Sequence, residues 1–314
     1  MVQEIPEDAT GKAVAFLLTG VAGGLGLDLC AKALLAHYSL EQFVFLRSLA
    51  GLAIFLLLAR QFGGFTSLVT RRWPWHALRT LLATGAMFGF FYGLAHMPLV
   101  TALTLGFTAP LMMTVLSALA LREAVGWRRW LAVGAGFGGV LMILRPGAAE
   151  ISLASIACLA GAFCYACLAI TARMLGRTES SYALSIYVIG GPMTVAAFVL
   201  GTGDGWVAPD RTGWLLFMAA GGCSVVAWIG IIGGYRRASP ALLAPFEYTA
   251  LIGGAVAGYV FWNEVPDAWV VAGSATIIAS GLFVVYREVG FRVPRRQPVP
   301  PSRPALPEVP PPPR

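Results

Sequence analysis

The chain is predicted to be an all-α polytopic membrane protein, and three observations predict it. First, 58% of its 314 residues are hydrophobic and only 12% are charged, whereas a water-soluble domain carries about a quarter charged residues. Second, the mean hydropathy is +0.75, and the excess lies in apolar runs of about 20 residues, the length that a bilayer-spanning helix needs. Third, the polar patches between the runs are short, which leaves no room for a sizeable catalytic domain outside the membrane.

The first five apolar runs each predict one transmembrane helix. The first run is not a cleavable signal, because an acidic segment precedes it and Asp28 and Lys32 lie inside it. The second carries Arg47, the third ends at His96, and the fourth opens directly after Pro98. The fifth is bounded by arginines on both sides. The expected helices are 13–36, 43–58, 79–96, 99–121 and 130–144.

The second five runs repeat this organisation. The seventh run contains Pro192, the ninth opens with Pro240, and the tenth begins at Trp269. The expected helices are 153–174, 182–200, 214–234, 240–262 and 269–286. The sequence therefore predicts ten transmembrane helices. It then ends in a stretch that holds ten of the chain's 20 prolines, and this composition predicts a disordered cytoplasmic tail at 288–314.

The positions of the positive charges indicate how these helices are oriented. If the N-terminus is cytoplasmic, 18 of the 22 Lys and Arg residues fall in cytoplasmic segments, and only Arg145 and Arg211 fall in segments on the opposite side of the membrane. Lys32 and Arg47 lie within the expected helices. Because cytoplasmic loops of membrane proteins collect Lys and Arg, both termini are expected to be cytoplasmic. The net charge of +7 is then explained by topology, and no nucleic-acid partner is expected.

The two halves of the sequence repeat each other. Pro98 and Pro240 open the fourth and ninth runs and stand 142 positions apart, and Glu123 and Glu264 follow the same runs 141 positions apart. Five helices per copy mean that the second copy enters the membrane from the opposite side. Such inverted repeats are typical of transporters in which a central site alternates its access. The expected units are 1–12, a cytoplasmic segment; 13–146 and 151–287, the two five-helix repeats; and 288–314, the tail.

Several motifs occur in matching order in the two halves. The first half has Lys32, Arg47, the segment GLAHMPLVTALTLGFTAP at 93–110 and LRE at 121–123. The second half has ASPALLAPFEYTALI at 238–252 and NEVP at 263–266. Together these motifs resemble the drug/metabolite transporter superfamily, in its EamA-type ten-helix branch, and the resemblance covers about residues 13–287. APFEYT at 244–249 is similar to the branch with S-adenosylmethionine and riboflavin uptake carriers, and Asn263 stands where the family usually has Gly.

Ionisable groups inside the expected helices are the first candidates for a solute site, because they are costly to bury in a bilayer. Asp28 and Lys32 are four residues apart on one helix face, where they form either a static ion pair or part of a solute or proton site. Arg47 is expected to snorkel toward the interface, with a place in the cavity as the alternative. Glu247 lies beside Pro245, which removes a backbone hydrogen bond, and its carboxylate can bind a cationic solute or exchange a proton.

Aromatic and hydroxyl side chains complete the candidate site. The resemblance implies that several of the helices that carry them line a central cavity, where a planar solute can stack on the rings, although each ring can also serve in packing. Pro110 and Pro245 are candidate hinges, and Glu123 and Glu264 are expected at the interface, in pairing or gating. The full set of expected solute-binding residues is Glu247, Tyr248, Lys32, Asp28, Tyr92, Thr104, Phe107, Tyr165, Trp228 and Tyr235.

The sequence therefore favours a secondary transporter of a small metabolite in the cell inner membrane. Its expected partners are a small-molecule solute and the lipid bilayer, with proton or ion coupling left open. No cofactor is expected, and the absence of a phosphate-binding GxxxxGK[ST] loop argues against direct coupling to ATP. The five cysteines and three histidines lack metal-ligand spacing, so neither a metal nor a catalytic residue is expected. The alternative is a membrane-embedded enzyme acting on a lipid-soluble substrate.

Overall fold

The computed structural model describes residues 7–57, 72–122, 125–146, 151–175, 181–203, 205–238 and 240–290, and the elements formed by these residues are α-helices. The first half contains α1 (Glu7–Leu35), α2 (Leu40–Leu57), α3 (Trp73–His96), α4 (Leu99–Gly106), α5 (Ala109–Ala120) and α6 (Trp127–Leu144). The second half contains α7 (Leu153–Leu175), α8 (Ser181–Thr202), α9 (Arg211–Tyr235), α10 (Pro240–Glu247), α11 (Thr249–Trp262) and α12 (Ala268–Gly290). The tail expected at 288–314 lies almost wholly outside the described residues.

Two of the expected helices, those with the candidate hinges Pro110 and Pro245, are each broken into two. The expected helix 99–121 is divided into α4 and α5 at Phe107 and Thr108, and the expected helix 240–262 is divided into α10 and α11 at Tyr248. Pro110 lies in the first turn of α5, where a missing backbone N–H costs nothing. Pro245 lies inside α10, so that short helix lacks one of its internal hydrogen bonds.

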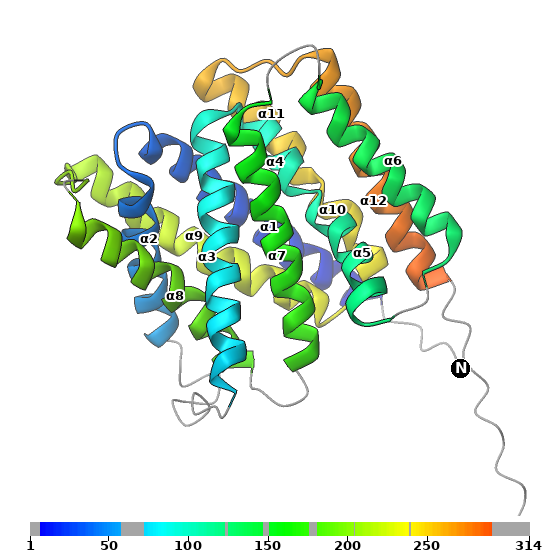
Figure 1. Cartoon of the computed structure of the whole chain (residues 1–314), viewed down its shortest axis with the longest axis horizontal. Helices are drawn as coiled ribbons and strands as arrows, with labels where there is room; N and C mark the ends of the chain where they lie inside the picture. Colours follow the sequence, from blue (N-terminus) through cyan, green and yellow to red (C-terminus); the bar gives the residue numbers. More distant parts are fainter. Residues whose placement is uncertain are drawn as a thin grey trace, which may run out of the picture.

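The helices pack as pairs that join the two halves of the chain. In Figure 1, α6 and α12 run side by side along the right edge, and α2 and α8 lie together toward the left. Between these edges, α1 packs on α9, and α3 packs on α7. Each pair takes one helix from each half, so the bundle is held together by contacts between the halves.

Glycines make the two central contacts close, at Gly20 on α1 and at Gly85, Gly89 and Gly93 on α3, whereas nothing lies within 4 Å of the Cβ position of Gly24. A Cβ on Gly20 would lie 2.6 Å from the Ile231 backbone nitrogen, and one on Gly230 would lie 2.4 Å from the Gly20 nitrogen. A Cβ on Gly89 would lie 2.4 Å from the Ala157 carbonyl oxygen, and one on Gly161 would lie 2.8 Å from the Phe90 nitrogen. Gly20 and Gly161 stand 141 positions apart, as do Gly89 and Gly230.

The helix ends follow local sequence signals. Ser39 Oγ accepts a hydrogen bond from the Gln42 N–H at 3.2 Å, and Asp210 caps α9 by accepting from the Gly213 N–H at 2.6 Å, as N-cap residues do. Two helices begin six residues earlier than expected, α1 at Glu7 and α3 at Trp73. Pro74 suits the first turn of α3, and polar residues at 7–12 extend α1 beyond its apolar part.

Large apolar side chains cover both the interior and the outer surface. The interior is built around fully buried residues such as Phe43, Leu99 and Phe217, whereas Leu57 and Phe198 are more than two-thirds exposed. An extensive exposed apolar surface is what a lipid environment requires. Within the described residues, six helices are long and apolar enough to cross a membrane, at Gly11–Leu35, Trp73–His96, Leu99–Ala120, Leu153–Ala172, Arg211–Tyr235 and Ala268–Tyr286. The chain therefore forms a polytopic all-α membrane protein, and the count of ten remains a prediction.

Candidate functional site

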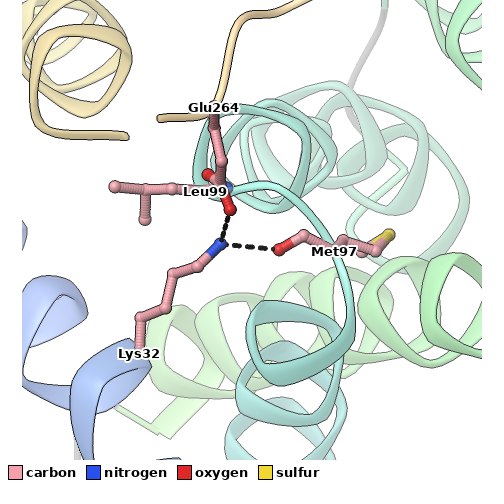
Figure 2. Close-up of polar contacts among 4 residues, drawn as sticks. All are labelled: Lys32, Met97, Leu99 and Glu264. Carbon is pink, nitrogen blue, oxygen red and sulfur yellow. Dashed lines mark hydrogen bonds and ion pairs between the residues drawn. The ribbon is translucent and has the colours of Figure 1, made fainter. Parts of the chain in front are cut away.

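A buried ion pair joins the end of α1 to the end of α11 (Figure 2). The Lys32 ammonium donates a hydrogen bond to Glu264 Oε1 at 2.5 Å and another to the Met97 carbonyl oxygen at 2.9 Å. Glu264 Oε2 accepts a hydrogen bond from the Leu99 N–H at 2.7 Å. The Lys32 and Glu264 side chains are only 10% and 20% exposed, and the Trp262 ring centroid lies 5.5 Å from the ammonium.

The local backbone explains why these groups meet. Asn263 ends α11 in the left-handed region at φ 55°, and the Glu264 N–H then donates to the Gly258 carbonyl oxygen at 3.0 Å. This turn directs Glu264 back toward the bundle. On the other side, Pro98 starts α4 and leaves the Leu99 N–H without an intrahelical acceptor. Glu264 thus caps α4 and neutralises Lys32 at the same time.

Of the two alternatives for Asp28 and Lys32, the static ion pair between them is not formed, because Lys32 is paired with Glu264 instead. Both residues do lie on α1, but the long Lys32 side chain extends to Met97 and the end of α11, whereas the charge within electrostatic range of Asp28 is Arg47 on α2. Glu264 is paired, as one of its expected roles required, and its carboxylate is mostly buried between α1 and α4.

The sequence suggested that the Arg47 side chain snorkels to the membrane interface. In the structure it instead lies inside the bundle. Its side chain is 9% exposed, and its guanidinium lies 5.7 Å from the Phe91 ring centroid on α3. Because α2 begins at Leu40, three residues earlier than expected, Arg47 lies two turns inside the helix. The alternative interpretation, a place in the interior, is the one that the structure favours.

A second polar cluster lies at the break between α10 and α11. Tyr235 at the end of α9 donates a hydrogen bond to Glu247 Oε1 at 2.6 Å. Tyr165 on α7 and Tyr248 at the break lie within electrostatic range of the same carboxylate. The Tyr248 ring centroid is 5.2 Å from that of Phe107, which stands at the α4–α5 break. Five expected site residues from four parts of the chain are therefore gathered around the two helix breaks.

Other expected site residues lie apart from this cluster. The Tyr92 ring packs on His96, with ring centroids 4.3 Å apart. Thr104 is fully buried, donates to the Val100 carbonyl oxygen at 2.8 Å, and shares a hydrogen bond with Ser274 at 2.9 Å. Its hydroxyl thus links α4 to α12. Trp228 lines two cavities on α9. Glu123 lies outside the described residues.

The sequence did not reveal the two backbone groups that contact the Lys32–Glu264 ion pair. The Met97 carbonyl and the Leu99 N–H flank Pro98, and a proline at that point is a signal that neighbouring backbone groups lack helix partners. Ser48 was missed as well. It is 1% exposed and follows Arg47 on α2, and it differs from an ordinary helical serine in that its hydroxyl has no hydrogen-bond partner among the described residues.

Comparisons with known proteins agree with this architecture. The signature of the EamA-like transporter family matches residues 11–145. A solved crystal structure, described only as that of a protein, superposes with a TM-score of 0.63 over 89% of this chain and 99% of that chain. The two sequences are 17% identical, so this likeness concerns the fold.

Curated relatives cover most of the chain. A riboflavin transporter of Vibrio cholerae serotype O1 is 31% identical over 226 residues, which are 71% of this chain and 74% of the relative. An S-adenosylmethionine uptake transporter of Rickettsia bellii is 27% identical over 72% of this chain and 77% of that protein. The pseudopaline exporter CntI of Pseudomonas aeruginosa is 28% identical over 76% of this chain and 84% of that protein.

These relatives, the matching signature and the apolar helices lead to one conclusion. The chain is a multi-pass protein of the cell inner membrane. By its 31% identity with a relative of which it covers 74%, it belongs to the EamA-like transporter family of the drug/metabolite transporter superfamily.

Proposed function

We propose that this protein is a secondary active transporter that works by alternating access between two inverted five-helix repeats, residues 13–146 and 151–287. Its relatives are named for riboflavin, S-adenosylmethionine and pseudopaline, so the proposed cargo is a small metabolite of this size, amino-acid-like, S-adenosylmethionine-like, riboflavin-like or drug-like. In this proposal the chain crosses the membrane ten times, because α4 with α5 and α10 with α11 each form one broken span. Both termini are cytoplasmic.

The observation that carries the proposal is the ion pair between Lys32 and Glu264. Lys32 and the groups around Pro98 belong to the first half of the chain, whereas Glu264 belongs to the second half. The two halves cannot separate at this face unless the pair breaks. With cytoplasmic termini, α1 ends at the outer face, so Lys32 and Glu264 act as an outer gate that is closed in this structure.

The repeated packing supports a motion between equivalent halves. The contact of α1 with α9 at Gly20 and Gly230 has its counterpart in the contact of α7 with α3 at Gly161 and Gly89. In the sequence the same offset of 141 positions relates Lys32 to Arg173 and Glu264 to Glu123. The gating role expected of Glu123 is therefore proposed for the cytoplasmic face, although the structure describes neither of these two side chains.

The cluster at the helix breaks is the proposed solute site. Glu247 offers a carboxylate held by Tyr235, and the Tyr248 and Phe107 rings offer faces on which a planar or cationic group can stack. Because the chain breaks at Tyr248 and Phe107, backbone groups become available there, as in the broken helices of other transporters. Glu247 is also the proposed group for proton coupling.

The direct test is solute movement by the full chain in proteoliposomes. We expect counterflow of at least one member of a panel that includes riboflavin, S-adenosylmethionine and the common amino acids. Glu247→Gln is expected to slow it by about tenfold or more, because hydrogen bonds to a charged group are worth about 1.5–3 kcal/mol. Glu41→Gln in the first turn of α2 is the matched control and should transport normally.

Two results would contradict the proposal. Movement of no solute under any gradient, together with chemical change of a lipid-soluble substrate, would favour the membrane-embedded enzyme instead. Equal transport by Glu247→Gln and the unaltered protein would remove Glu247 from the solute site, while the transport function itself would stand.

A further inference from the structure

A small cavity lies among α2, α8 and α9. Its volume is about 90 Å³, and its walls include Arg47, Ser48 and Gly51 of α2, Ile189 of α8, and Ser224 and Trp228 of α9. A water molecule takes about 30 Å³ of liquid volume. The cavity thus has room for a group of three or four heavy atoms, and not for a whole metabolite.

Two polar side chains in this wall are buried without partners. Arg47 is 9% exposed and Ser48 is 1% exposed. Among the described residues, neither the Arg47 Nε nor the Ser48 Oγ has a hydrogen-bond partner. A buried donor that is left unsatisfied costs about 1–3 kcal/mol, and more when it is charged. Two such donors on adjacent residues of α2 would gain a hydrogen bond from an acceptor that reached them.

The Arg47 guanidinium has a carboxylate nearby but forms no ion pair with it among the described residues. Asp28 on α1 lies within electrostatic range of Arg47, and this carboxylate offsets part of the cost of burying the cation. Within the described part of the chain, however, no ion pair joins the two residues. Phe91 lies against the guanidinium at 5.7 Å and offers no acceptor oxygen. The Arg47 guanidinium therefore has at least one N–H group, at Nε, that makes no hydrogen bond among the described residues.

The wall opposite Arg47 is rigid. Helices α2 and α9 touch where a Cβ on Gly221 would lie 2.5 Å from the Ala50 Cβ. Ser224 Oγ donates its proton to the Gly221 carbonyl oxygen at 2.7 Å, so it presents no hydrogen to the cavity. Arg47 and Ser48 are therefore the residues of α2 in this wall whose donors are not already used, and such donors suit an anionic oxygen group.

We propose that Arg47 and Ser48 bind a carboxylate group of the transported solute, so that the substrate class of this transporter is a carboxylate-bearing metabolite. The planar carboxylate matches the geometry of the guanidinium fork, and its size matches the cavity. Trp228 also lines a second cavity of about 460 Å³ beside α1, so the solute's apolar part has a surface next to the carboxylate. The inference rests on the proposed transport function.

The test measures binding apart from transport, by the shift in thermal unfolding of the purified full chain in detergent. The probes are S-adenosylmethionine and L-methionine, their decarboxylated amines, L-methionine methyl ester, and riboflavin as a solute without a carboxylate. We expect at least one acid to stabilise the protein at a concentration about tenfold or more below that of its ester or amine. Arg47→Gln should abolish this discrimination, and Ser48→Ala should reduce it severalfold.

Arg79→Gln is the matched control for the loss of a buried arginine. Arg79 is 4% exposed and donates to the Leu168 carbonyl oxygen and to Thr171, so this variant should lose stability and keep the preference for the acid. If Arg47→Gln does not fold, Arg47→Lys and Ser48→Ala decide the matter, because both keep the site compact while removing part of the carboxylate geometry.

Three results would each overturn the carboxylate site. They are that no acid probe binds, that acid and ester bind equally, or that the Arg47 and Ser48 variants keep the preference for the acid. Transport of riboflavin by a protein that ignores all the acids would do so while leaving the transport function intact. Conversely, acids that bind through Arg47 but are never moved in liposomes would contradict the transport function and leave the carboxylate site standing.

Discussion

At the scale of single residues, the scarce charges inside the membrane were identifiable from the sequence, but their partners were not. Lys32, Arg47 and Glu247 stood out because charged groups are rare within apolar runs. Lys32 nevertheless pairs with Glu264, 232 positions away, and not with the nearby Asp28. A partner within one helix can be found from spacing, whereas a partner on another helix depends on how the bundle packs.

Asn263 provides a test of how the ion pair is positioned. Its φ of 55° lies in the left-handed region, which Gly and Asn tolerate and β-branched residues do not. We expect Asn263→Val to lower the free energy of unfolding by about 1–2 kcal/mol, and Asn263→Gly to change it little. Thermal or denaturant unfolding in detergent measures this. Ile252→Val, at an exposed helical position of α11, is the control, and equal effects of the two Val variants would contradict the prediction.

Asp267 provides a pH-dependent test outside the membrane. It accepts hydrogen bonds from the Val270 N–H at 2.9 Å and the Trp269 N–H at 3.0 Å, and it pairs with Arg145. The Val270 N–H and the Arg145 guanidinium hold the pKa of this carboxyl below its ordinary value. The stabilisation it provides is therefore complete above about pH 4, the ordinary aspartate range, and is lost as the pH falls through the lower folded pKa.

The measurement compares the thermal unfolding midpoints of the unaltered protein and Asp267→Asn. We expect a constant difference between pH 5 and pH 7, because Asp267 is ionised in both the folded and unfolded chain there. Below about pH 4 the difference should shrink. A difference that stays the same down to pH 3 would mean that the carboxylate charge does not stabilise the start of α12.

At the scale of helices, the apolar runs predicted where helices occur but not where two of them break. Pro110 and Pro245 indicated irregular backbone in the fourth and ninth runs, yet the breaks fall at Phe107–Thr108 and at Tyr248. A proline disturbs the turn before it, which fits the break ahead of Pro110, whereas the break at Tyr248 comes three residues after Pro245. Here the Phe107 and Tyr248 rings meet at 5.2 Å, a contact between runs that no single-run pattern contains.

The glycine contacts test whether the two halves pack equivalently. We expect Gly89→Ala and Gly230→Ala to destabilise the protein by similar amounts, about 1–3 kcal/mol each, because the new methyl group meets the backbone of the facing helix. Gly138→Ala on α6 is the control, since nothing lies within 4 Å of its Cβ position, and it should be neutral or stabilising. Unfolding in detergent gives the values, and an effect at only one of the two sites would contradict equivalent packing.

At the scale of the whole molecule, the most extensive helix contacts join different halves of the chain. The pairs α1–α9, α3–α7, α2–α8 and α6–α12 each combine a helix before residue 146 with one after residue 151. A polar contact also joins the halves, because Gln42 of α2 bonds both the nitrogen and the oxygen of Val207 before α9. A change in the angle between the halves therefore alters every one of these contacts at once.

The proposed outer gate can be tested by exchanging its charges. Lys32→Glu and Glu264→Lys alone each place like charges in a mostly buried contact, and we expect each to slow transport by about tenfold or more. The double variant restores an ion pair and should recover a substantial part of the rate in proteoliposomes. Glu41→Lys at the start of α2 controls for a charge reversal elsewhere. Failure of the double variant to exceed both single variants would show that the attraction itself is not what matters.

The sequence by itself determined that this is a polytopic membrane protein, where its apolar helices lie and which ionisable residues fall inside them. Each of these properties depends on composition and local spacing. The tertiary structure decided which of those residues meet. It joined Lys32 to Glu264, brought Glu247 to Tyr235, and kept Arg47 inside the bundle beside Ser48. These outcomes follow from contacts between different helices, where close packing and the cost of burying an unpaired charge select one partner among many.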